Sequence, residues 1–168
     1  MSAKAAELVY QSGDFVVYPT HGVGVVKGTE TQEVGDLKVE VIVIHFGSER
    51  MTLRVPTERA KKSGLRPICD LDEFTNAMQV LKGKAKIKRT MWSRRAQEYE
   101  AKINSGDPIL IAEVVRDLYR GADQSNQSFS ERQIYQSALS RFARELAAIK
   151  GVEENEAERN IEEVLMAA

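Results

Sequence analysis

The chain has 168 residues, of which 42% are hydrophobic and 29% are charged, and its formal net charge is −1. This length suits one domain or two small ones, and a net charge so close to zero excludes a histone-like protein that coats nucleic acid indiscriminately. The single cysteine, Cys69, excludes an internal disulfide framework. Because the sequence also shows no signal peptide and no apolar run long enough to span a membrane, we expect a cytoplasmic protein.

Residues 13–60 follow a strand pattern. From Val41 the pattern is apolar on both faces, which is typical of a central strand that is covered on both sides. The dipeptide Gly35-Asp36 separates two strand-like runs, a spacing that suits a hairpin with glycine in the first turn position. Four or five short strands with tight connections predict a small barrel or a rolled sheet.

After residue 70 the apolar residues recur at helical spacing. Asp70 or Asp72 can cap a first helix, and a second helix begins near Thr90. This second helix places four residues on one face, namely Trp92, Ala96, Tyr99 and Ile103.

Three further helices are predicted, and two of them carry signals at their ends. Asp107-Pro108 is an N-cap followed by proline at the first helical position. We expect the next helix to begin with a capping box of Ser130 and Gln133, with Phe129 as part of a hydrophobic staple. A last helix covers about 154–167. The sequence therefore predicts an α+β protein of two domains, a small β-barrel followed by a compact all-α bundle.

Residues that could support catalysis or metal binding are sparse. His21, His45 and Cys69 do not have the spacing of metal ligands. The glycines of residues 22–28 lack the strand–loop–helix context of a phosphate-binding loop, and no serine or cysteine stands in a nucleophile motif. We therefore expect no enzyme activity, no cofactor and no metal site.

The strongest functional signal is the basic stretch 82–102, in which eight lysines and arginines oppose two glutamates and surround the only tryptophan. Spacing alone leaves an ordinary core role open for Trp92. The charges favour another role, because cations crowd the start of the helix, where its dipole is already positive. These cations are Lys88, Arg89, Arg94 and Arg95. Phosphates would be bound by these side chains and the free helical N–H groups, while the indole stacks on a base or wedges against one.

The chain contains, in this order, the motifs "GDFVVYPTHGVGVV", "LRVP", "WSRR" and "SGDPILIAEVVRDLYRG". Their order and spacing resemble the CarD/CdnL family of bacterial RNA polymerase-binding transcription regulators, over nearly the whole chain. The resemblance implies a Tudor-like, SH3-like domain, residues 1–68, that binds the β subunit of RNA polymerase. It also implies a helical domain, residues 69–168, that contacts promoter DNA at the upstream edge of the transcription bubble. Such a protein is a non-enzymatic, nucleoid-associated regulator that stabilises the open complex.

Individual residues follow from the matched motifs. The resemblance implies that Trp92 wedges into the minor groove, with Arg94 and Arg95 beside it. The implied polymerase-binding residues are Thr31, Gln32, Glu33, Val34 and Arg54. Gln32 departs from relatives that carry a basic residue there, and the lysine run before Trp92 departs from relatives with a more acidic linker. The assignment of Lys88 and Arg89 to DNA therefore depends on the charge argument alone.

Two other functional classes remain open at this point. A stand-alone Tudor-like module that binds peptides or RNA would use an aromatic cage, yet the strand region 13–60 offers only Phe15, Tyr18 and Phe46, on different strands. An enzyme would need a polar cleft lined by carboxylates.

The chain ends in Ala167-Ala168 after apolar residues. This ending resembles the tails that the ClpXP protease reads, which would make that protease a partner. An ordinary frayed helix end is the alternative interpretation.

Overall fold

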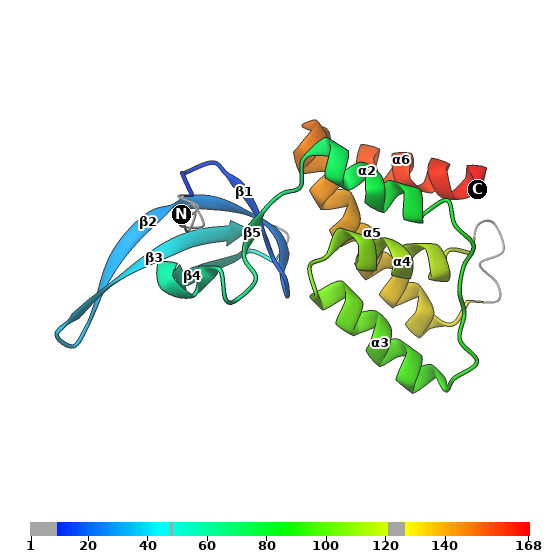
Figure 1. The fold of residues 1–168 in the computed structure, drawn as a ribbon, viewed down its shortest axis with the longest axis horizontal. Coiled ribbons are helices and arrows are strands. Elements are labelled where there is room, and N and C mark those ends of the chain that lie inside the picture. Colours follow the sequence, from blue (N-terminus) through cyan, green and yellow to red (C-terminus); the bar gives the residue numbers. More distant parts are fainter. Residues whose placement is uncertain (1–9, 48, 121–126) are drawn as a thin grey trace, which may run out of the picture. The chain divides into compact units, whose positions relative to one another are not determined.

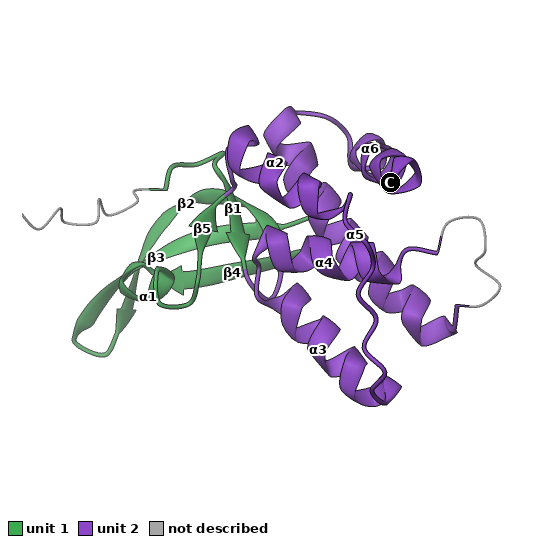
Figure 2. Ribbon diagram, turned by 45° about the vertical axis from the view of Figure 1, so that its right-hand side comes forward, with its two compact units in different colours: residues 1–18, 23–67 green, residues 19–22, 68–168 purple. Residues whose placement is uncertain are grey.

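The computed structural model describes residues 10–47, 49–120 and 127–168. The chain divides into two compact units, which we call the β unit and the helical unit (Figure 2). The β unit contains the described residues up to Tyr18 together with Val23–Pro67, and the helical unit contains Pro19–Gly22 together with Ile68–Ala168. The protein is α+β, as the sequence predicts. None of the described helices is both long enough and apolar enough to cross a membrane.

The β unit is built on one five-stranded sheet with the order β4-β3-β2-β1-β5 (Figure 1). The strands are β1 (Phe15–Tyr18), β2 (Gly22–Val34), β3 (Leu37–Phe46), β4 (Met51–Pro56) and β5 (Arg66–Pro67). A single helical turn, α1 (Thr57–Ala60), follows β4. β5 returns to pair antiparallel with β1, through Val16 and Pro67, so the first and last strands of the unit are neighbours.

The alternation of side chains along β3 creates the core of this unit. Ile42, Ile44 and Phe46 are buried on one face, together with Val26 of β2 and Val55 of β4. On the other face of β3, Val41 and Val43 are buried as well, which confirms the prediction of a strand covered on both sides. Gly24 permits the close approach of β2, because a Cβ there would lie 2.6 Å from the Ile44 side chain and 2.8 Å from Phe46.

The hairpin of β2 and β3 extends beyond the other strands (Figure 1). β4 pairs with β3 only from Val41 onward, whereas β2 and β3 remain paired to the turn, where Val34 faces Leu37. Gly35 has a φ of 63°, a conformation that favours glycine, and this confirms the predicted turn. The tip of the hairpin is therefore a two-stranded ribbon.

The described part of the helical unit contains five helices, and the other four pack against α5. They are α2 (Leu71–Val80), α3 (Trp92–Asn104), α4 (Pro108–Leu118), α5 (Phe129–Lys150) and α6 (Glu154–Ala167). Their apolar faces form one core, in which the rings of Phe74 and Phe142 lie 4.7 Å apart between centroids. Leu118 of α4, Leu139 of α5 and Ile161 of α6 are also buried there.

Two of the predicted caps are confirmed. The Asp70 carboxylate accepts the N–H of Glu73 at 2.7 Å, and the Asp107 carboxylate accepts the N–H of Ile109 at 2.9 Å, ahead of proline at the first position of α4. Each carboxylate satisfies one of the free donors at its helix start.

The predicted cap of α5 is wrong. Ser128, rather than Ser130, is the N-cap, and its hydroxyl accepts the N–H of Glu131 at 3.1 Å. Because the helix begins earlier than predicted, Phe129 is its first residue and is exposed rather than forming a staple. Ser130 is thereby left free for the contact described next.

Candidate functional site

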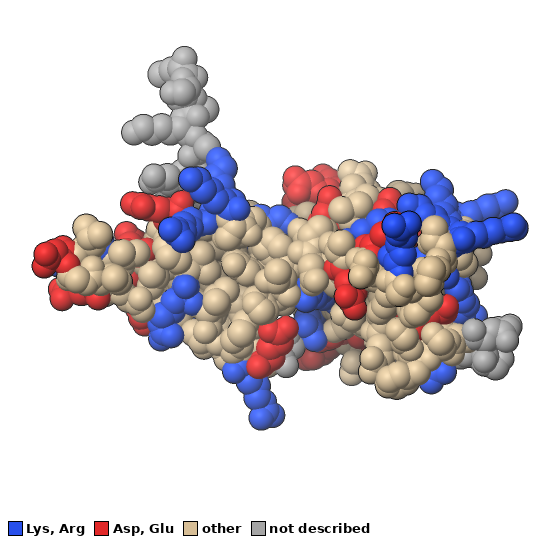
Figure 3. Space-filling model, turned by 90° about the horizontal axis from the view of Figure 1, so that it is seen from below, with Lys and Arg blue, Asp and Glu red and all other residues tan. Residues whose placement is uncertain are grey.

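The first candidate surface lies at the start of α3, which we call the α3 tip. No side chain caps this helix, and its first turn contains no acidic residue. The uncapped N–H groups therefore keep their partial positive charge. Figure 3 shows lysine and arginine side chains gathered over one end of the helical unit.

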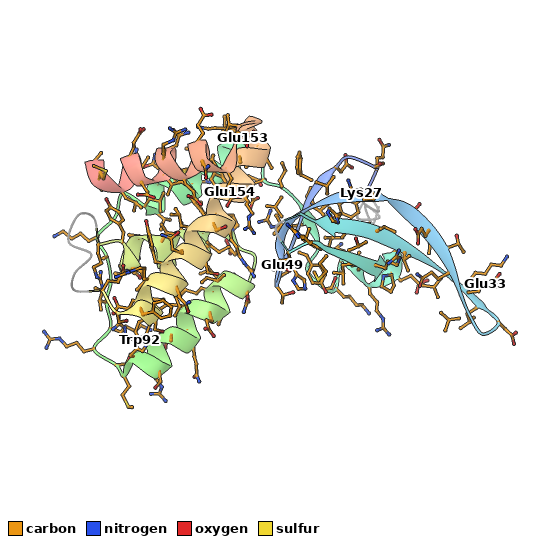
Figure 4. All side chains as sticks on the ribbon, turned by 180° about the vertical axis from the view of Figure 1, so that it is seen from behind. Lys27, Glu33, Glu49, Trp92, Glu153 and Glu154 are labelled. Atoms are coloured by element: carbon orange, nitrogen blue, oxygen red, sulfur yellow. The ribbon has the colours of Figure 1, made fainter. Side chains whose placement is uncertain are left out.

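Trp92 is the first residue of α3 and is half-buried (Figure 4). Its ring packs against the edge of the helical core, with its centroid 6.2 Å from that of Tyr99. Its indole N–H donates to the hydroxyl of Ser130 on α5, at 3.2 Å. The indole is thus neither inside the core nor loose in solvent, but held at the surface by two helices.

Arg95 completes this arrangement. Its guanidinium carbon lies 5.4 Å from the centroid of the Trp92 ring and 5.7 Å from that of Tyr99, and its Nη2 donates to the Tyr99 hydroxyl at 3.2 Å. Such cation–π contacts are worth about 0.5–1 kcal/mol each at partly exposed sites. The buried Nε of Arg95 has no hydrogen-bond partner among the described residues. The main contact of the Arg95 guanidinium is therefore with the Trp92 and Tyr99 rings.

The other cations predicted at the α3 tip differ from Arg95. Arg94 and Arg89 are exposed, and neither forms an ion pair within the described ranges 10–47, 49–120 and 127–168. Lys88 lies 3.6 Å from the Glu98 carboxylate, in an exposed pair that is worth at most about 1 kcal/mol. Arg89 and Arg94 are thus the cations that remain most available to a ligand.

Sequence reasoning missed two exposed apolar side chains near the indole. Met91, the N-cap residue, is 78% exposed, and Phe129, which precedes Ser130, is 72% exposed. The position of Met91 directly before Trp92 could have indicated it. No local pattern indicated that Phe129 would be exposed, because the predicted capping box assigned it to a hydrophobic staple.

The second candidate surface is the tip of the β2–β3 hairpin. Thr31, Gln32, Glu33 and Val34 are all exposed and pair with β3 along one edge. Among the described residues, no strand pairs with their other edge. Val34 and Leu37 give this tip two apolar side chains, 63% and 71% exposed, and Glu33 lies beside them (Figure 4).

Arg54 lies on β4, at the base of this hairpin. Its Nε donates to the Glu30 carboxylate of β2 at 3.3 Å, across the intervening strand β3. Both side chains are about half exposed. Arg54 therefore lies one strand away from β2, which carries the other predicted polymerase-binding residues, and contacts Glu30 of that strand. No local sequence pattern indicated Glu30.

The geometry does not favour the aromatic cage of a stand-alone Tudor-like module. Phe46 is fully buried, so it cannot line an aromatic cage together with Phe15 and Tyr18. In the part of the chain that the structure describes, no three His, Cys, Asp or Glu residues lie close enough to hold a metal ion.

Comparison with known proteins identifies both parts of the chain. Residues 10–69 match the family model described as CarD-like/TRCF RID domain, and residues 76–162 match the one described as CarD, C-terminal domain. A protein of Bacillus subtilis (strain 168) named "Putative transcription factor YdeB" is 30% identical over 148 residues, which cover 88% of this chain and 97% of that protein. The two matched domains follow each other along the chain as the β unit and the helical unit do, and the chain therefore belongs to the CarD family.

Proposed function

We propose that this protein is a non-enzymatic transcription regulator that bridges RNA polymerase and promoter DNA. The β unit, as a Tudor-like domain, binds the polymerase β subunit, and the helical unit binds DNA at the upstream edge of the transcription bubble. The protein acts in the cytoplasm, at the nucleoid. Membership of the CarD family, a domain model named for CarD and TRCF, and a relative named as a transcription factor all support this proposal.

The hairpin tip supplies the polymerase contact. A strand with unpaired backbone groups can add to the edge of a partner's sheet, which gives affinity with little demand on side chains. Thr31–Val34 would form that strand, and the apolar side chains of Val34 and Leu37 would be covered in the complex. Arg54 would exchange Glu30 for a carboxylate of the partner, in a forked hydrogen bond.

The observation that carries the DNA contact is the indole of Trp92, held between Ser130 and Arg95 at an uncapped, cationic helix start. A ring that is already fixed loses little conformational entropy when it binds. Phosphates on either side would be bound by Arg89, Arg94 and the free N–H groups of α3. Contacts of this kind are largely independent of sequence.

Stabilisation of the open complex then needs no chemical step. At the edge of the bubble the bases are already partly unstacked, so a wedge inserts there at the lowest cost. Since the wedge binds the open state better than the closed one, it shifts the equilibrium between them. Attachment to polymerase raises the local concentration of the helical unit near DNA, so the DNA contact itself can be weak.

A role for ClpXP remains a separate proposal. α6 ends at Ala167, and both Ala167 and Ala168 are exposed. The tail is therefore accessible to a protease that reads a terminal Ala-Ala.

The lifetime of the open complex on a ribosomal RNA promoter tests the proposed function. We expect wild-type protein to prolong this lifetime and Trp92→Ala to lose most of the effect, because a stacked or wedged aromatic contact is worth about 1–3 kcal/mol, a factor of roughly 5 to 150. Met166→Ala, which truncates another exposed apolar residue far along the chain, serves as the control and should behave as wild type. If Trp92→Ala prolongs the open state as well as wild type does, the wedge assignment is wrong.

A further inference from the structure

The carboxylate of Asp117 has no part in the site described above, yet it is 4% exposed and charged. It lies near the end of α4 and accepts two hydrogen bonds, from the backbone N–H of Lys86 and from Nε of Arg116, each at 2.9 Å. A buried carboxylate with two donors, one of them cationic, is a strong and directional anchor. Asp117 therefore fixes the backbone of the segment that joins α2 to α3.

The same segment, residues 82–91, which we call the linker, also approaches Arg116 closely. A Cβ on Gly83 would lie 3.3 Å from the carbonyl oxygen of Val80 and 3.5 Å from a guanidinium nitrogen of Arg116. The linker thus passes closely over Arg116 before it reaches Asp117. It then follows an extended course to the start of α3 (Figure 1).

The anchored linker carries three lysines whose side chains have no partner among the described residues. The side chains of Lys82, Lys84 and Lys86 are exposed, and none forms an ion pair or hydrogen bond within residues 10–47, 49–120 and 127–168. The three lysines occupy alternate positions. Lys82 lies in the hydrogen-bonded turn that ends α2, where its N–H donates to the carbonyl of Gln79, whereas Lys84 and Lys86 follow the bend at Gly83. In an extended segment the side chains of Lys84 and Lys86 point to the same side about 6.6 Å apart, a spacing comparable with that of successive phosphates on one DNA strand.

We propose that Lys82, Lys84 and Lys86 form a phosphate-binding strip for the duplex next to the promoter fork, and that Asp117 is the residue that positions this strip. The inference rests on the proposed function and extends the DNA contact from the α3 tip along the linker. A fixed backbone matters here because long lysine side chains lose less freedom on binding when their attachment points are already in place. Such a strip neutralises phosphates without reading bases.

The salt dependence of DNA binding tests the strip. Full-length protein is titrated into a fluorescent DNA fork with a duplex arm at several KCl concentrations, and the logarithm of the binding constant is plotted against that of the salt concentration. The triple variant Lys82→Gln, Lys84→Gln, Lys86→Gln should lower the steepness of this line by up to about 2.7, since each neutralised phosphate contributes about 0.9.

A charge-matched control separates local contacts from the overall field. Lys27→Gln, Lys38→Gln, Lys61→Gln removes three exposed lysines of the β unit. This triple should leave the steepness as in wild type. If the two triple variants show the same salt dependence of DNA binding, the linker lysines contribute only general surface charge. The proposal of a phosphate-binding strip would then be wrong.

Variants of Asp117 test the positioning role. Asp117→Ala removes the acceptor for the Lys86 N–H and should lose part of the salt-dependent affinity, whereas Asp117→Asn keeps an acceptor oxygen and should retain more of it. Combined with the linker triple variant, Asp117→Ala should cause no further loss, because it acts through the same lysines. An additional loss in that combination would contradict the role. Circular dichroism and the unfolding temperature report whether Asp117→Ala folds, and Asp117→Asn decides the question if it does not.

The experiments distinguish an error in the strip proposal from an error in the proposed function. If wild-type protein does not bind the fork, or binds it as well after Trp92→Ala, the DNA contact proposed for the α3 tip fails, and the strip with it. If binding depends on Trp92 while the two lysine triples are indistinguishable, the strip alone fails.

Discussion

At the scale of single residues, the orientation of Trp92 depends on one hydroxyl group, that of Ser130. Ser130→Ala would remove the acceptor of the indole N–H, at a cost of about 0.5–1.5 kcal/mol in the free energy of unfolding. Because Trp92 is the only tryptophan in the chain, its fluorescence reports on this site alone. We expect Ser130→Ala to increase the quenching of Trp92 fluorescence by acrylamide and to shorten the open-complex lifetime less than Trp92→Ala does.

Ser128→Ala is the matched control, since Ser128 caps the same helix but does not contact the indole. It should lower the free energy of unfolding by about 0.5–2 kcal/mol without changing the quenching. Equal quenching in wild type and Ser130→Ala would show that the hydroxyl does not hold the ring.

The same two serines show where sequence reasoning ends for single residues. Ser128 precedes Glu131 and Ser130 precedes Gln133, so the sequence contains two overlapping capping-box patterns. The local sequence pattern cannot distinguish between them. Because Ser130 was assigned as the cap, its contact with Trp92 was not predicted. The pair of Arg54 and Glu30 was unpredictable for another reason, because the two residues meet only through the register of three strands.

At the scale of elements, α6 carries a stripe of acidic residues at helical spacing, Glu154, Glu158 and Glu162. Burial, together with the neighbouring carboxylates of Glu154 and Glu162, raises the pKa of Glu158, while Arg144 acts in the opposite direction. A raised pKa means that the folded state binds this proton more tightly than the unfolded state does. The contribution of Glu158 to stability therefore falls as the pH rises through its unfolded and then its folded pKa.

Glu158→Gln should consequently raise the unfolding temperature slightly at pH 7, where the wild-type carboxylate is charged. The gain should disappear below the ordinary glutamate pKa of about 4.3, where the wild-type group is protonated in both states. Thermal unfolding followed by circular dichroism at the two pH values measures the difference, with the exposed Glu163→Gln as control. A gain of equal size at both pH values would contradict the assignment.

Most elements were predictable because their signals are local. The turn at Gly35, the caps at Asp70 and Asp107, and the apolar run of β3 each follow from a few adjacent residues. The sheet order was not predictable in the same way. β5 has only two residues and exists because Arg66–Pro67 meets β1, nearly fifty residues earlier in the chain.

At the scale of the whole molecule, the proposed function requires both units in one chain. Arg54→Glu should weaken binding to the polymerase β subunit by at least about 30-fold, since disrupting one partner of a buried interfacial charge pair costs about 2–5 kcal/mol. The fold should persist, because the exposed pair of Arg54 and Glu30 contributes at most about 1 kcal/mol. Co-purification with the β subunit measures the first effect and the unfolding temperature measures the second.

Glu30→Gln is the control for this prediction. It frees Arg54 from its intramolecular partner, so binding to the β subunit should be kept or strengthened. Unchanged co-purification of Arg54→Glu would show that Arg54 is not part of the polymerase contact. If Glu30→Gln weakens binding as much as Arg54→Glu does, the ion pair shapes the hairpin rather than meeting the partner.

The two-stranded hairpin tip has one more consequence, for the protein when it is unbound. Its open edge and the apolar pair of Val34 and Leu37 form a template on which a second copy of the chain can align, the first step towards aggregation. Glu33 and Glu40 lie on this ribbon, so two copies brought edge to edge would repel each other. Because salt screens such repulsion, the solubility of the free protein should be most vulnerable where ionic strength is high and no partner covers the edge.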